Sequence, residues 1–85
     1  MSFTPAFAPD AKSQWLSLDP VHQELSLDEL ERLCASPPPG VEHVATAVYE
    51  EAGMLHHVFL HVLVNHRQQS ITVVGVGHAL IPVRS

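Results

Sequence analysis

The sequence has few positive charges and a single cysteine. Four lysines and arginines stand against nine aspartates and glutamates, which gives a formal net charge of −5 at pH 7. A balance of this sign repels a phosphate backbone, so strong nucleic-acid binding is not the default expectation. Cys34 has no partner for an internal disulfide, and a lone cysteine favours a reducing compartment.

Long hydrophobic runs are also missing. No stretch is long enough to span a bilayer, and the N-terminus lacks the basic and apolar regions of a signal peptide. The sequence therefore predicts a cytoplasmic protein with no membrane contact. A length of 85 residues predicts one domain, residues 1–85, and the 46% hydrophobic and 15% charged composition favours a folded chain.

The chain is organised around the stretch from Gly53 to Pro82. Two β-branched and apolar runs, residues 54–64 and 71–76, flank a polar loop and are typical of a strand, a loop and a strand. Upstream, the pattern predicts these elements: an edge strand within 2–7, a short helix from about 8 to 18, a second helix from 20 to 34, and a strand over 44–50.

The second predicted helix carries Val21, Leu25, Leu30 and Leu33 towards a partner surface. Asp19 is a candidate N-cap for it. Ser26 and Glu29 form a capping-box pattern that could start a separate helix, although one continuous helix is the preferred interpretation. Two helices followed by a run of strands predict an α+β fold of two layers, with a helical hairpin packed on an antiparallel sheet of three to four strands.

Five of the seven histidines lie between His56 and His78. If Asn65 pairs with Ser70, antiparallel register places His57 opposite His78, and paired residues share one side of the sheet. Two neighbouring imidazoles can act as base and acid in cleavage of an RNA phosphodiester, so His57 and His78 are the candidate catalytic residues.

One observation and one alternative interpretation weigh against this chemistry. Cations that would stabilise developing negative charge are scarce, since only Arg67 and Arg84 are near in sequence. The alternative is that these are ordinary surface histidines of a half-solvated sheet. The pair formed by His57 and His78 has no evident third ligand, so the sequence predicts neither a metal site nor a cofactor.

Several short segments, taken in order, resemble the RelE/ParE superfamily of small toxins from bacterial toxin–antitoxin modules. The segments span nearly the whole chain: Ala8-Pro9-Asp10-Ala11 with Trp15 and Leu18, Gln23, Leu30-Glu31-Arg32-Leu33, Pro38-Pro39-Gly40, His57-Val58-Phe59-Leu60, and Val76-Gly77-His78. The resemblance implies a curved sheet backed by two helices. It also implies an RNA target on the ribosome or an action on DNA gyrase, and an antitoxin that binds the toxin.

The active-site pattern implied by this resemblance is mostly replaced. Arginines frequent in the family's nucleases correspond here to Val48, His57 and Ala79, and His78 alone matches. At position 57, histidine lacks the permanent positive charge and the two parallel N–H donors with which an arginine binds a phosphate. The resemblance thus implies a toxin-like component of a type II toxin–antitoxin module, and the replaced arginines point to weak or lost ribonuclease activity, with an antitoxin or other protein as its partner.

Two alternatives stay open at this point. One is an active RNA endonuclease that uses the histidine pair. The other is a non-catalytic scaffold or dimerisation module, for which a homodimer would be the expected assembly. The Val-, Ile- and Phe-rich strands favour protein binding, because a surface or edge lined in this way can take an added strand or helix.

Overall fold

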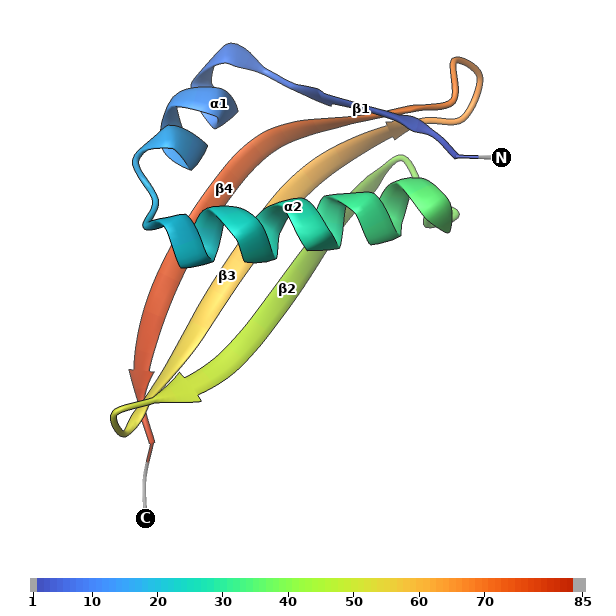
Figure 1. Ribbon diagram of the computed structural model, residues 1–85. Helices are drawn as coiled ribbons and strands as arrows, with labels where there is room; N and C mark the ends of the chain where they lie inside the picture. Colours follow the sequence, from blue (N-terminus) through green and yellow to red (C-terminus); the bar gives the residue numbers. More distant parts are fainter. Residues whose placement is uncertain (1, 84–85) are drawn as a thin grey trace.

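The computed structural model describes residues 2–83 and shows two helices packed on one four-stranded sheet. The elements are β1 (Thr4–Phe7), α1 (Pro9–Leu16), α2 (Pro20–Ala35), β2 (Glu42–Glu51), β3 (Met54–Asn65) and β4 (Ser70–Pro82). The sheet curves, and α2 lies across its concave side (Figure 1). The predicted α+β fold, a pair of helices on a curved sheet, is confirmed.

The strand order in the sheet is β1-β4-β3-β2. Strands β2, β3 and β4 follow one another as antiparallel neighbours, as predicted. Strand β1 adds a short parallel edge strand beside β4. An edge position suits this strand because Pro5 has no amide hydrogen to give to a ladder.

The turn between β2 and β3 uses two residues with positive φ, Ala52 at 52° and Gly53 at 75°. Two such residues in a tight hairpin give the turn a twist that matches the right-handed twist of its strands. The turn predicted at Glu51-Ala52-Gly53 is therefore present.

Helix α2 is continuous from Pro20 to Ala35, so Ser26 does not start a second helix. Its N-cap, Asp19, has extended backbone angles, but the Asp19 side chain makes no capping hydrogen bond, contrary to expectation. Proline occupies the first turn of each helix, where its missing N–H costs nothing. Neither helix has the length and apolar composition needed to cross a membrane.

The buried face of α2 differs from the predicted one. It consists of His22, Ser26, Leu30 and Cys34, whereas Val21 is 57% exposed. A hydrophobic pattern alone misses this face because two of its four members are polar. Ser26 is accommodated because its hydroxyl accepts a hydrogen bond from Trp15 Nε1 at 2.8 Å and donates one to the Gln23 carbonyl oxygen at 2.7 Å.

The alternation of β3 is confirmed. Its even-numbered residues Val58, Leu60, Val62 and Val64 are buried in the core. Leu60, Val62 and Val64 pack in one cluster with residues of β4 and of the helices, namely Ile71, Val73, Val76, Ala11, Leu30 and Cys34. We call the opposite side of the sheet the outer face; its exposed apolar side chains are Val44, Val48, Phe59, Leu63 and Ile81.

A β-bulge changes the register that the sequence predicts for β3 and β4. Val62 pairs with Val73, but the next pair is His61 with Gly75, so Val74 is an extra residue on β4. Beyond the bulge, His78 pairs with Val58 and His57 pairs with Ala79. The predicted pairing of His57 with His78 is wrong, because one inserted residue moves every later side chain to the other face.

Candidate functional site

Four aromatic side chains that can carry or share protons meet between the start of α2 and the sheet. We call them the histidine cluster: His22 of α2, Tyr49 of β2, His56 of β3 and His78 of β4. His22 is buried, and the other three are partly buried. Four elements thus contribute one residue each to a site that is half open to solvent.

Two short hydrogen bonds connect the cluster in pairs. His22 Nε2 lies 2.6 Å from the Tyr49 hydroxyl oxygen, and His56 Nδ1 lies 3.1 Å from His78 Nε2. The ring of Tyr49 stacks on that of His56 with centroids 4.5 Å apart. The ring of His22 lies against that of His78 with centroids 3.9 Å apart, at a tilt of 32°. One nitrogen atom from each of the three histidines lies within 4.8 Å of the other two.

The local sequence explains how the four side chains converge. His22 lies on the face of α2 that also carries Ser26 and Leu30, since residues four apart lie on one side of a helix. Tyr49 and His56 are directly opposite each other in the β2–β3 ladder. The bulge after Val73 turns His78 to the same side.

The site disfavours positive charge on His78. Burial is the main cause that lowers the pKa of His78, and charge on His22 and His56 would lower it further, while Asp19 acts in the opposite direction. The pKa of Tyr49 is raised by burial first, and then by the negative charges of Glu51 and Asp19. The lowered pKa favours the neutral form of His78 at pH 7, in which one ring nitrogen is an acceptor.

The arrangement can hold and move protons, but it lacks fixed positive charge. Within residues 2–83, no hydrogen bond or ion pair joins a lysine or arginine to the histidine cluster. Arg32 is paired with Glu29 on α2 at 2.7 Å, and Arg67 lies in the hairpin between β3 and β4. Arg84, the other cation weighed from the sequence, lies outside the described residues.

The structure brings one predicted site residue into the cluster and leaves the other out. His78 is a member, whereas His57 lies on the outer face, opposite Val48 of β2. Sequence reasoning missed His22, Tyr49 and His56. The signals were present: His56 shares the parity of buried Val58, and His22 precedes Ser26, Leu30 and Cys34 at steps of four.

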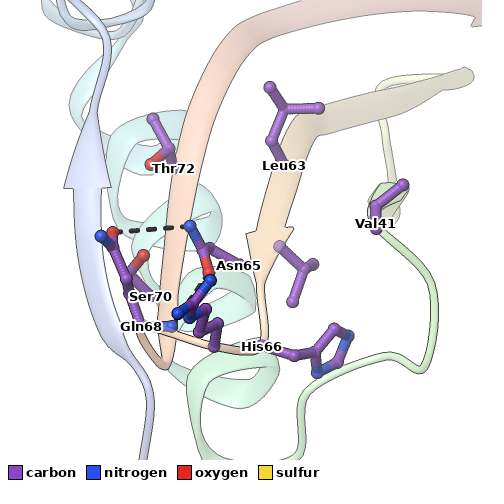
Figure 2. Close-up of a pocket in the computed structure, with 9 residues that line it drawn as sticks. Val41, Leu63, Asn65, His66, Gln68, Ser70 and Thr72 are labelled. Carbon is purple, nitrogen blue, oxygen red and sulfur yellow. Dashed lines mark hydrogen bonds between the residues drawn. The ribbon is translucent and has the colours of Figure 1, made fainter.

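A surface depression of about 620 Å³ lies elsewhere, around the β3–β4 hairpin, and does not include the cluster. Figure 2 shows its lining, with Asn65 and Gln68 joined by a hydrogen bond and His66 beside them. The Asn65 side-chain oxygen also accepts a hydrogen bond from the backbone N–H of Gln68 at 2.9 Å. These polar groups hold the hairpin loop in shape, so we assign the candidate site to the histidine cluster.

The fold is that of RelE toxins. A free arginine double mutant of the Escherichia coli toxin RelE matches with a TM-score of 0.70 and 18% identity, over 91% of this chain and 83% of that one. The toxin–antitoxin complex RelBE2 from Mycobacterium tuberculosis matches with a TM-score of 0.67 and 17% identity, over 93% of this chain and 100% of that one. An archaeal RelE–RelB complex from Pyrococcus horikoshii matches with a TM-score of 0.60 and 14% identity, over 89% of this chain and 93% of that one.

No protein-family model and no curated protein sequence matches the chain. The fold predicted from the RelE/ParE resemblance is therefore confirmed by structure, at sequence identities of 14–19%.

Proposed function

We propose that this protein is the toxin-like component of a bacterial type II toxin–antitoxin module, with weak or lost ribonuclease activity and an antitoxin protein as its main partner. The observation that carries the proposal is the RelE-like fold over nine tenths of the chain, with similar structures that include toxin–antitoxin complexes. The scarcity of cations near the histidine cluster supports weak or lost cleavage, because phosphoryl transfer needs positive charge on the developing anion.

Protein binding is supported by the outer face. Val44 and Val48 of β2 are 58% and 51% exposed, and Phe59 and Leu63 of β3 lie beside them at 38% and 44%. Contiguous apolar side chains on a soluble domain mark interaction surfaces. An amphipathic helix or strand of an antitoxin would bury these residues.

The test is complex formation with a candidate antitoxin, taken as the product of any short reading frame found next to the gene for this protein. Co-expressed and purified, the two chains should elute together at a fixed stoichiometry in size-exclusion chromatography with light scattering. Growth of the host with and without that partner reports any toxicity. Elution of the two chains as separate species would contradict the proposal.

A matched pair of substitutions locates the contact. Val48→Asp places a charge on the outer face, and Val21→Asp places the same charge on α2 at a similar exposure, 57% against 51%. We expect Val48→Asp to weaken the complex at least about tenfold, because a desolvated charge costs more than 1.4 kcal/mol at an interface. Val21→Asp should bind like the wild type. Equal affinities of the two variants would remove the outer face from the contact.

RNA endonuclease activity is the second candidate function. It is favoured by the hydrogen bond of 3.1 Å between His56 and His78, since two imidazoles at this distance can serve as base and acid. The catalytic pair would then be His56 and His78, in place of His57 and His78, the pair predicted from the sequence.

Cleavage of cellular mRNA after expression tests this second candidate. Loss of cleavage in His56→Ala and His78→Ala, with cleavage retained in His57→Ala, is the expected pattern. Growth arrest that persists in the double variant of His56 and His78 would rule out histidine catalysis. Loss of cleavage in His57→Ala alone would restore the assignment made from the sequence.

A further inference from the structure

We propose that His22, His56 and His78 form a binding site for a divalent transition metal of the Zn²⁺ class. This assignment goes beyond the proposed function and does not depend on it. The three imidazoles come from α2, β3 and β4, and one nitrogen of each lies within 4.8 Å of the others. Imidazole nitrogen is a ligand that suits Zn²⁺, Cu²⁺ and Ni²⁺, whereas Mg²⁺ and Ca²⁺ prefer oxygen.

The spacing of the nitrogens is close to what coordination needs. Ligand nitrogens of a tetrahedral Zn²⁺ lie about 3.3 Å apart, given a bond length of about 2.05 Å. His56 Nδ1 and His78 Nε2 are already 3.1 Å apart. One nitrogen of each histidine lies within 4.8 Å of the others, so the largest separation has to shorten by about 1.5 Å for coordination. Three protein ligands leave a fourth position for water.

The surroundings favour a cation and give it a route in. His56 and His78 are only partly buried, so an ion can reach them from solvent. Asp19 and Glu51 act electrostatically on Tyr49, and Asp19 acts on His78, so two carboxylates lie near the site. Tyr49 contacts His22 Nε2 at 2.6 Å and stacks on His56, and groups of this kind orient the ligands of a metal.

A metal here would join three elements that are far apart in sequence. His22 precedes His56 by 34 residues (56 − 22) and His78 by 56 residues (78 − 22). The ion would therefore hold the start of α2 against the sheet. An ion that binds the folded chain but not the unfolded chain stabilises the folded state, so the melting temperature should increase with Zn²⁺ concentration.

The test uses the full chain with any purification tag removed and with metal stripped by a chelator. Titration with Zn²⁺ in a calorimeter should show one site, and Co²⁺ should give the strong visible absorption of tetrahedral coordination. His56→Ala and His78→Ala should each weaken Zn²⁺ binding at least about 100-fold, beyond the 10–100-fold typical of a residue outside the ligand set. Ca²⁺ should leave the melting temperature unchanged.

His57→Ala and His61→Ala are the matched controls, because both imidazoles lie on the outer face. Their affinity should stay within about threefold of the wild type, a change of less than 1 kcal/mol. If either control loses as much affinity as the cluster variants, Zn²⁺ binds surface histidines and the proposal fails. NMR of the wild type, which needs no variant to fold, gives a second decision. Added Zn²⁺ should shift the imidazole signals of His22, His56 and His78, and shifts confined to other histidines would overturn the site.

Discussion

Replacing Ser26 by alanine should destabilise the protein by about 1 kcal/mol. The Ser26 side chain is 1% exposed and accepts the indole N–H of Trp15 at 2.8 Å. Without the hydroxyl, that N–H keeps only the Gln23 carbonyl oxygen at 3.3 Å. An orphaned buried donor costs about 1–3 kcal/mol, and the remaining contact places this case near 1.5 kcal/mol. The better helix propensity of alanine returns about 0.5 kcal/mol.

The assays are unfolding in urea, which gives the free energy, and thermal unfolding, both followed by circular dichroism and by fluorescence of the single tryptophan, Trp15. A loss of about 1 kcal/mol corresponds to a decrease in melting temperature of about 4–8 °C for a domain of this size. Ser13→Ala on the exposed side of α1 is the control and should change stability by no more than about 0.5 kcal/mol.

A double-mutant cycle with Trp15→Phe isolates the hydrogen bond itself. The coupling free energy between Ser26→Ala and Trp15→Phe should be about 1 kcal/mol, because phenylalanine has no N–H to orphan. Strict additivity of the two substitutions would refute the reasoning, as would a Ser26→Ala variant that is as stable as the wild type.

Two further predictions concern the sheet and the core. A Cβ on Gly77 would clash with the outer end of the Phe59 ring, so Gly77→Ala should destabilise by about 1 kcal/mol as the ring is displaced. A Cβ on Gly75 would meet its nearest atom, His61 Cβ, at 3.5 Å, so Gly75→Ala should cost less. Thermal unfolding of both variants checks this. Burial raises the pKa of the Cys34 thiol, so the folded state holds this proton above about pH 8.5, where an unfolded cysteine ionises. Stability should be intact below that pH and fall as the pH rises, and this component of the slope should be missing in Cys34→Ala.

The sequence was sufficient for the elements and their layers. The parity of Val58, Leu60, Val62 and Val64 identified the buried side of β3, and the prolines at 9 and 20 marked both helix starts. These features depend on local periodicity and backbone chemistry, which a single chain displays directly.

The site depended on two features that local patterns do not encode. Gly75 within the strand is compatible with a bulge, but the sequence does not fix its position. This single extra residue decides whether His56 or His57 of β3 lies on the same face as His78. The second feature is the buried face of α2, where His22 and Ser26 are stabilised by partners on other elements. A polar residue on a helix looks solvent-exposed until those partners are known.

The order of strands has a consequence for biosynthesis. Strand β4 lies inside the sheet, between β1 and β3, although it is the last of the described elements to leave the ribosome. The β1–β4 ladder begins with the pair Thr4 and Ser70, so β1 cannot pair until a residue 66 positions later (70 − 4) has been synthesised. Until translation reaches β4, the nascent chain has only the β2–β3 hairpin and unsupported helices, with their apolar surfaces open to chaperones.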